Sequence, residues 1–78
     1  MEEGAFLLEL GQRIRAQRKR LGLTQEQLAL VADIDRSYYG SIERGERNLT
    51  FTVLCRLCQA LECDVADLSA GLPPKPVS

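Results

Sequence analysis

Residues 23–45 read LTQEQLALVADIDRSYYGSIERG, and this stretch decides the fold. Its pattern predicts two short helices, Gln25–Ala32 and Arg36–Arg44, joined by a tight turn. Thr24 is a good N-cap for the first helix, and Gln27 three residues later completes a capping box. The start of this helix is therefore fixed by local signals alone.

The second of these helices has its own start signal and two distinct sides. Asp35 is its cap, and Ile34 and Tyr39 can form an apolar staple around it. On a helical wheel, Tyr39 and Ile42 lie on one side, with Tyr38 and Ser41 on the flanks. The opposite side carries Arg36, Ser37, Gly40 and Arg44. A small helix with such a polar face fits the DNA major groove, which is about 12 Å wide.

Three further helices are predicted outside this stretch, so the fold class is all-α, a compact domain of five helices. One runs from about Ala5 to Leu21. Another follows Thr50 as its N-cap, and a short last helix follows Asp64. The folded domain is expected to span residues 1–70. The tail GLPPKPVS, residues 71–78, has no periodicity and is expected to be flexible.

Composition restricts the class of protein. A chain of 78 residues with 45% apolar residues is one small domain, and its core is marginal alone. No apolar run approaches the roughly 20 residues that a membrane span needs. The start MEEGAF lacks the basic segment and cleavage site of a signal peptide. We therefore expect a cytoplasmic protein with no membrane partner.

The net charge of −1 hides an uneven distribution. Residues 13–47 hold eight basic and five acidic side chains, a balance of +3. The first twelve residues contribute −3 and residues 48–78 contribute −1. A basic surface is the usual mark of a nucleic-acid partner. The basic segment contains the two capped helices, so double-stranded DNA is a candidate partner. The alternative for the basic cluster on the first helix is a solvated face with ordinary ion pairs.

The segments LTQEQLA, DRSYYGSIERG and ERNLT together resemble the helix-turn-helix of the phage Cro/repressor class, also called the xenobiotic-response-element family. Within that class the chain is most similar to the small controller proteins of restriction-modification systems. The resemblance covers roughly residues 10–68. It implies a lambda-repressor-like fold and a sequence-specific transcriptional regulator that acts on its own promoter and that of the endonuclease. Two alternatives stay open: another small phage, plasmid or toxin-antitoxin repressor, and a protein-interaction domain that has lost DNA binding.

The chain departs from the family pattern at two turns. Asp33 stands between the two motif helices, where relatives often have a Gly with a positive φ. Asp is among the few residues that tolerate this conformation. Glu62 stands where relatives often have a helix-ending Gly, which leaves the boundary between the last two helices open. The family counterpart of Tyr39 is an apolar residue, so we assign Tyr39 to the core.

Three residues at the start of the recognition helix are expected to read DNA bases: Arg36, Ser37 and Tyr38. The planar fork of Arg36 matches the O6 and N7 acceptors of guanine. The alternative for Arg36 is an ion pair with Glu26 or Asp35. The alternative for Tyr38 is partial packing against the core.

A second group is expected to contact phosphates, which gives affinity but little sequence information. The resemblance implies this role for Gln25, at the first turn of its helix, and for Arg47 of the Arg-Asn pair. The whole group is Gln25, Ser41, Arg44, Arg47, Asn48, Thr50 and, from the first helix, Arg18.

A homodimer is expected, because one recognition helix makes few base contacts and the core of so short a chain is marginal. The last helices must supply the interface, for which we select Leu61, Val65, Leu68 and Leu72. RNA polymerase is a further candidate partner. No small-molecule ligand is evident.

The chemistry of an enzyme is missing from the sequence. There is no His, and only three Cys are present, whereas a structural zinc needs four ligands. Cys58 and Cys63 are expected to pack as small apolar residues, with Cys55 nearer the surface. We therefore expect no catalytic residue, no metal and no cofactor.

Overall fold

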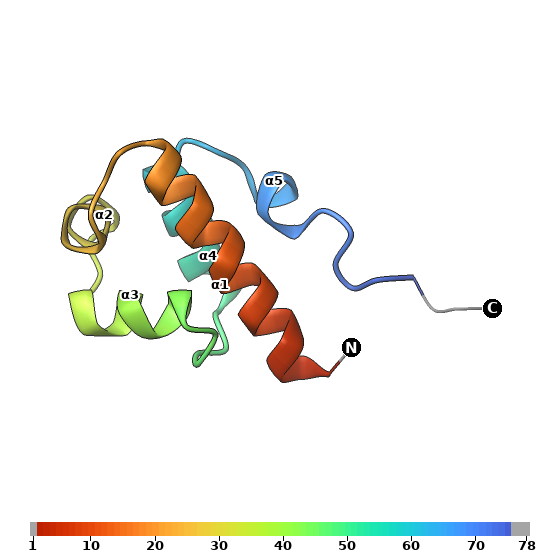
Figure 1. Cartoon of the computed structure of the whole chain (residues 1–78). Helices are drawn as coiled ribbons and strands as arrows, with labels where there is room; N and C mark the ends of the chain where they lie inside the picture. Colours follow the sequence, from red (N-terminus) through yellow and green to blue (C-terminus); the bar gives the residue numbers. More distant parts are fainter. Residues whose placement is uncertain (1, 76–78) are drawn as a thin grey trace.

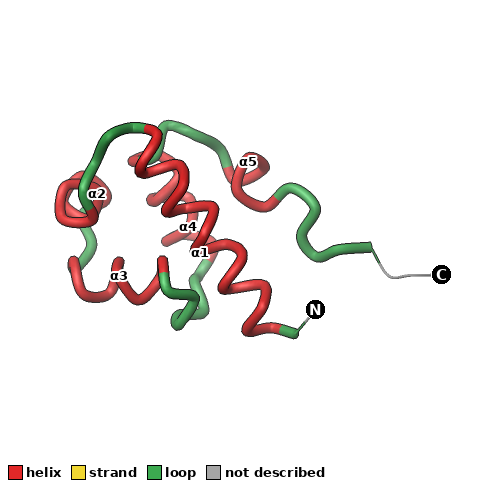
Figure 2. Tube along the Cα trace, in the orientation of Figure 1, coloured by secondary structure: helices red, strands yellow, loops and turns green. Residues whose placement is uncertain are grey.

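The computed structural model describes residues 2–75, which form five helices and no strand (Figures 1 and 2). The helices are α1 (Glu3–Arg20), α2 (Gln25–Ala32), α3 (Arg36–Glu43), α4 (Phe51–Ala60) and α5 (Val65–Ser69). The predicted all-α, five-helix fold is confirmed. The first helix begins two residues earlier than predicted. In the expected tail, residues 71–75 are irregular, and residues 76–78 lie outside the described part.

The start signals read from the sequence are present at both motif helices. The Thr24 hydroxyl accepts from the Gln27 N–H at 3.1 Å, and the Gln27 side chain accepts from the Thr24 N–H at 2.8 Å. The Asp35 carboxylate caps α3 by accepting from the Tyr38 N–H at 3.0 Å. Asp33 ends α2 in the left-handed region with φ 56°. The turn is thus formed without the expected glycine.

The boundary between the last two helices follows the same logic. Helix α4 ends at Ala60, and Glu62 takes φ 56°, the conformation that a glycine adopts more readily. Asp64 then caps α5 and forms a reciprocal capping box with Asp67. Short-range hydrogen bonds therefore define even the five-residue helix α5.

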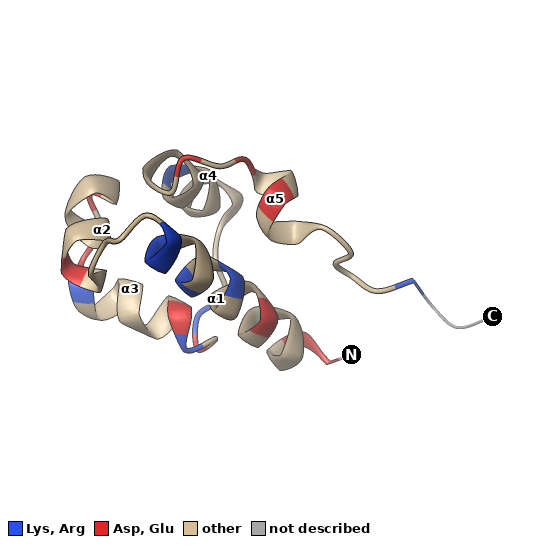
Figure 3. Ribbon diagram, turned by 45° about the horizontal axis from the view of Figure 1, so that its top comes forward, with Lys and Arg blue, Asp and Glu red and all other residues tan. Residues whose placement is uncertain are grey.

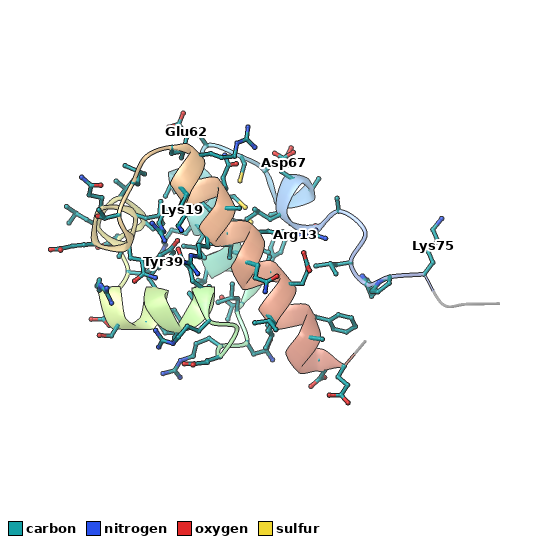
Figure 4. All side chains as sticks on the ribbon, in the orientation of Figure 1. Arg13, Lys19, Tyr39, Glu62, Asp67 and Lys75 are labelled. Atoms are coloured by element: carbon teal, nitrogen blue, oxygen red, sulfur yellow. The ribbon has the colours of Figure 1, made fainter. Side chains whose placement is uncertain are left out.

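Helix α1 runs diagonally through the middle of the view in Figure 1, and it contacts α3 and α5. The largest side chains with no exposure are Tyr39, Ile14, Leu28, Leu57 and Leu61. The core position predicted for Tyr39 is confirmed, and Figure 4 shows its side chain directed from α3 into the interior. No helix among the described residues is both long and apolar enough to cross a membrane.

The C-terminal end of α5 is tied to α1 by one side chain. The Arg13 guanidinium donates to the carbonyls of Leu68 at 3.0 Å and Ala70 at 2.7 Å. It also pairs with Glu9 at 2.9 Å. Figure 4 shows Arg13 reaching from α1 toward α5. A short helix that could not hold itself is therefore anchored by a charged donor from the longest one.

Helices α1 and α3 approach each other so closely that two glycines are required. A methyl group at Gly11 would lie 2.6 Å from the carbonyl oxygens of both Ile42 and Glu43. Gly45, just after α3, has φ +75°, and a methyl group there would lie 2.7 Å from the Cα atom of Leu8. Backbone meets backbone at both points, so neither contact can relax by a side-chain rotation.

Replacing Gly11 by Ala is expected to destabilise the protein by about 1–3 kcal/mol, because the two backbones must move apart. Gly4→Ala is the matched control, since no atom lies within 4 Å of a methyl group at that position of the same helix. The control should keep the wild-type stability or gain up to about 1 kcal/mol. Urea unfolding followed by circular dichroism measures both variants. Equal stabilities would show that α1 and α3 are not in backbone contact.

Candidate DNA interface

Basic and acidic side chains are unevenly distributed over the molecule. Figure 3 shows Lys and Arg along the second half of α1, whereas acidic residues mark the start of α1 and helix α5. This is the polarity that the sequence indicated. The individual basic side chains differ sharply in burial, and that difference decides which of them can meet a ligand.

The carboxylate of Glu43 is the centre of a buried polar network. Arg18 donates to it twice, from Nε to Oε2 at 2.6 Å and from Nη2 to Oε1 at 3.0 Å. The Gln25 amide donates to Oε1 at 3.0 Å, and the Tyr39 hydroxyl donates to Oε2. Arg18 is 7% exposed and Glu43 is 6% exposed. The network joins α1, α2 and α3 at one point.

These hydrogen bonds keep the network charged. Burial by itself would raise the pKa of Glu43, but donation from Arg18, Tyr39 and Gln25 outweighs burial and holds the pKa below its ordinary value. The hydrogen bond to Glu43 raises the pKa of Arg18. Burial, reinforced by the neighbouring carboxylate, raises the pKa of Tyr39. Carboxylate, guanidinium and neutral phenol are thus the stable forms.

The phosphate contact predicted for Arg18 is wrong. Its guanidinium is occupied by Glu43 and by the carbonyl of Leu23 at 2.8 Å, so it faces the interior. The sequence argument counted Arg18 as surface charge because it lies among other basic residues. A helical wheel holds the missed signal, since Arg18 follows the buried Ile14 by four residues on the same face.

The start of α3 is open to solvent at the residues predicted to read bases. Arg36 and Ser37 are exposed, and Arg36 forms no ion pair with any described residue. Arg36 therefore does not form the alternative ion pair with Glu26 or Asp35. Tyr38 is half-buried and packs against the core, which was the alternative to its role in base reading. Its ring also lies under the Arg47 guanidinium, 5.6 Å from centroid to carbon.

The loop after α3 folds back onto that helix. The Arg47 Nε donates to the Ser41 hydroxyl at 3.1 Å, and this hydroxyl donates to the Tyr38 carbonyl at 2.6 Å. Ser41 is 5% exposed, so its predicted phosphate contact is corrected: the hydroxyl holds Arg47 beside α3. Asn48 is exposed.

The other predicted phosphate contacts have varied surroundings. Arg44 is exposed and pairs with Glu46 at 3.1 Å, an exposed interaction that contributes little energy. Gln25 is half-buried against Glu43 at the first turn of α2. The Thr50 hydroxyl accepts from the Val53 N–H at 3.1 Å and so caps α4. Thr50 therefore has a structural role that is independent of any ligand.

Two of the four residues selected for the dimer interface are wrong. Leu61 has no exposure and Leu68 has 3%, because both pack into the core of the single chain. Val65 and Leu72 are half-buried. The large apolar side chains that are exposed among the described residues are instead Leu30, Val31 and Phe51, with Leu8 next. Leu30 and Val31 lie within the apolar run LALVA, residues 28–32, in which the sequence does not separate core positions from surface positions.

The burial expected for Cys58 is present, whereas Cys63 is no more buried in class than Cys55. Cys58 is buried, Cys55 and Cys63 are half-buried, and all three are free thiols. Burial raises the pKa of Cys58 to about 12, so this thiol stays protonated. Within residues 2–75, no group of three or more side chains is arranged as metal ligands.

Comparison with known proteins matches residues 14–68 to the helix-turn-helix family. The control protein C.SmaI of Serratia marcescens is 42% identical over 59 residues, which are 76% of this chain and 70% of that protein. The crystal structure of the restriction-modification controller protein C.AhdI from Aeromonas hydrophila superposes with a TM-score of 0.80. It is 42% identical, and the match covers 82% of this chain and 97% of that one.

A third similar structure is the restriction-modification controller protein C.Esp1396I, solved as a tetramer in complex with its natural 35 base-pair operator. It is 35% identical with a TM-score of 0.75, over 81% of this chain and 83% of that one. The chain belongs to the helix-turn-helix family, and its predicted resemblance to restriction-modification controller proteins is confirmed.

Replacing Glu43 by Gln is expected to cost about 3–5 kcal/mol of stability, because it leaves the buried Arg18 charge without a partner. Glu46→Gln is the matched control, since it breaks the exposed pair with Arg44 and should cost less than about 1 kcal/mol. Urea unfolding at neutral pH compares the two. Equal losses would mean that the buried pair contributes no more than the exposed one.

The same network predicts an acid dependence. Because the pKa of Glu43 is lower in the folded than in the unfolded protein, its contribution is complete above the unfolded value. The contribution is lost as the pH falls through the folded value. Wild-type stability should therefore decline in acid more steeply than that of Glu43→Gln, while Glu46→Gln follows the wild type.

Proposed function

We propose that this protein is a sequence-specific DNA-binding regulator of transcription in a restriction-modification system, acting on its own promoter and on that of the endonuclease. The observation that carries the proposal is the start of α3, where Arg36 and Ser37 are exposed while the opposite face is fixed by the Glu43 network. A rigid helix with an exposed guanidinium is suited to entering the major groove. The similarity to controller proteins supports the biological role.

Within this proposal the side chains divide into two groups. Arg36 reads a guanine, assisted by Ser37 and by the partly packed Tyr38. The contacts to phosphate come from residues on either side of α3: Gln25, Arg44, Arg47, Asn48 and Thr50. The first turn of α2 adds outward backbone N–H groups, which favour an anion.

We propose that the protein binds its operator as a homodimer, with Val65 and Leu72 as the part of the selected interface that remains accessible. Two copies would place their α3 helices in major grooves about 10–10.5 bp apart, or a multiple of that distance. RNA polymerase is the further partner that activation would require. The action takes place in the cytoplasm, where promoter and polymerase are found, and involves no catalysis.

The first test is salt-dependent binding to a duplex taken from upstream of the gene itself. Each neutralised phosphate lowers the log–log slope of affinity against salt by roughly 0.9, so several contacts should give a steep negative slope. Fluorescence anisotropy at several salt concentrations measures the slope. A slope near zero, or no binding to this duplex, would favour a protein-interaction domain instead.

The second test separates base contacts from phosphate contacts. Arg36→Ala should weaken operator binding by about 1–3 kcal/mol while leaving the weak binding to scrambled DNA largely intact. Arg47→Ala should weaken both more nearly alike. Arg56→Ala, an exposed arginine on α4, is the control and should change neither. If Arg36→Ala loses the same affinity on both duplexes, Arg36 is a phosphate contact and the base reader lies elsewhere on α3.

A further inference from the structure

Gly40 occupies the middle of α3, on the side that carries Arg36 and Arg44. Glycine in a helix interior lowers stability by roughly 0.5–1 kcal/mol relative to alanine. Gly40 also lacks the positive φ that would require a glycine, unlike Gly45. Gly40 therefore lowers the stability of α3 without being required by the backbone conformation.

The packing of the protein does not require this glycine. At Gly11 and Gly45, an added methyl group would meet backbone atoms at less than 3 Å. At Gly40 it would meet only the ends of flexible side chains. These can move aside at little cost, so alanine is compatible with the fold. The reason for a glycine at position 40 must therefore be sought in the side chains that lie around it.

Three polar groups converge on the position of the missing methyl group. The Nη1 atoms of Arg44 and Arg36 would lie 3.2 Å and 3.6 Å from it, and the Oε1 atom of Gln25 would lie 3.8 Å from it. The two arginines are four residues before and after Gly40, so all three positions share one helix face. Both guanidiniums fold inward over the gap, one from each end of α3.

The charge at this gap is largely uncompensated. Arg36 has no ion pair among the described residues, and Arg44 has only the exposed pair with Glu46. Two cations held over one glycine repel each other unless an anion lies between or beside them. The arrangement is thus prepared for an acceptor-rich partner such as a guanine edge or a phosphate.

We propose that Gly40 is a positioning residue for DNA binding: its missing side chain lets Arg36 and Arg44 lie together against α3, beside Gln25. This inference rests on the proposed function and deepens it. A methyl group at position 40 would shift the Arg44 guanidinium slightly and would meet the Arg36 guanidinium at ordinary contact distance. A longer side chain such as glutamine would take the space over Gly40 and keep the two guanidiniums from lying together there.

The test uses Gly40→Ala and Gly40→Gln in the full chain, titrated with the upstream duplex at fixed salt. Both variants should be as stable as the wild type or more stable, with the melting temperature of Gly40→Ala raised by about 2–8 °C. Operator affinity should fall slightly for Gly40→Ala and by at least about fivefold for Gly40→Gln. About fivefold is the low end of what one bidentate base contact contributes. Gly4→Ala and Gly4→Gln are the matched controls and should not change operator affinity.

A double-mutant cycle tests whether the effect passes through the arginines. In the Arg36→Ala, Arg44→Ala background, Gly40→Gln should cause no further loss of affinity. Wild-type operator affinity in Gly40→Gln, a loss of stability in Gly40→Ala, or an undiminished effect in that background would each overturn the inference. Failure of the wild type itself to bind any duplex would instead refute the proposed function on which this inference rests.

Discussion

The buried carboxylate of Glu43 is the interaction on which the rest of the structure depends. It accepts hydrogen bonds from α1, α2 and its own helix, and so fixes the angle of the helix-turn-helix against the longest helix. A buried ion pair adds little net stability, but removing one member leaves the other as an uncompensated buried charge, which strongly destabilises the fold. The pair therefore acts mainly as a constraint: alternative packings of α3 would leave the Arg18 charge buried alone.

This constraint and the glycine contacts act together. The close approach at Gly11 and Gly45 brings the end of α3 against α1, and that approach puts Glu43 within reach of Arg18. The outward side of α3 takes part in neither the Glu43 network nor the close contacts with α1. Its exposed residues can then change with the operator while the fold stays constant.

Local signals in the sequence predicted most of the fold. The caps at Thr24, Asp35 and Asp64 depend on residues three positions apart, and all three are present. The functional surface was harder, because burial depends on contacts distant in sequence. Arg18 and Glu43 are separated by 25 residues, so charge counting placed Arg18 on the surface. Leu61 and Leu68 were selected for an interface because nothing in their spacing tells the core of one chain from the contact of two.

The burial of Cys58 has a practical consequence. Its thiol is 3% exposed, and its pKa of about 12 keeps it in the unreactive protonated form while the chain is folded. Alkylating reagents can therefore reach it only when the helices around it separate. The labelling rate of Cys58, relative to that of the half-buried Cys55, therefore reports how often the core opens. This measurement needs no engineered probe.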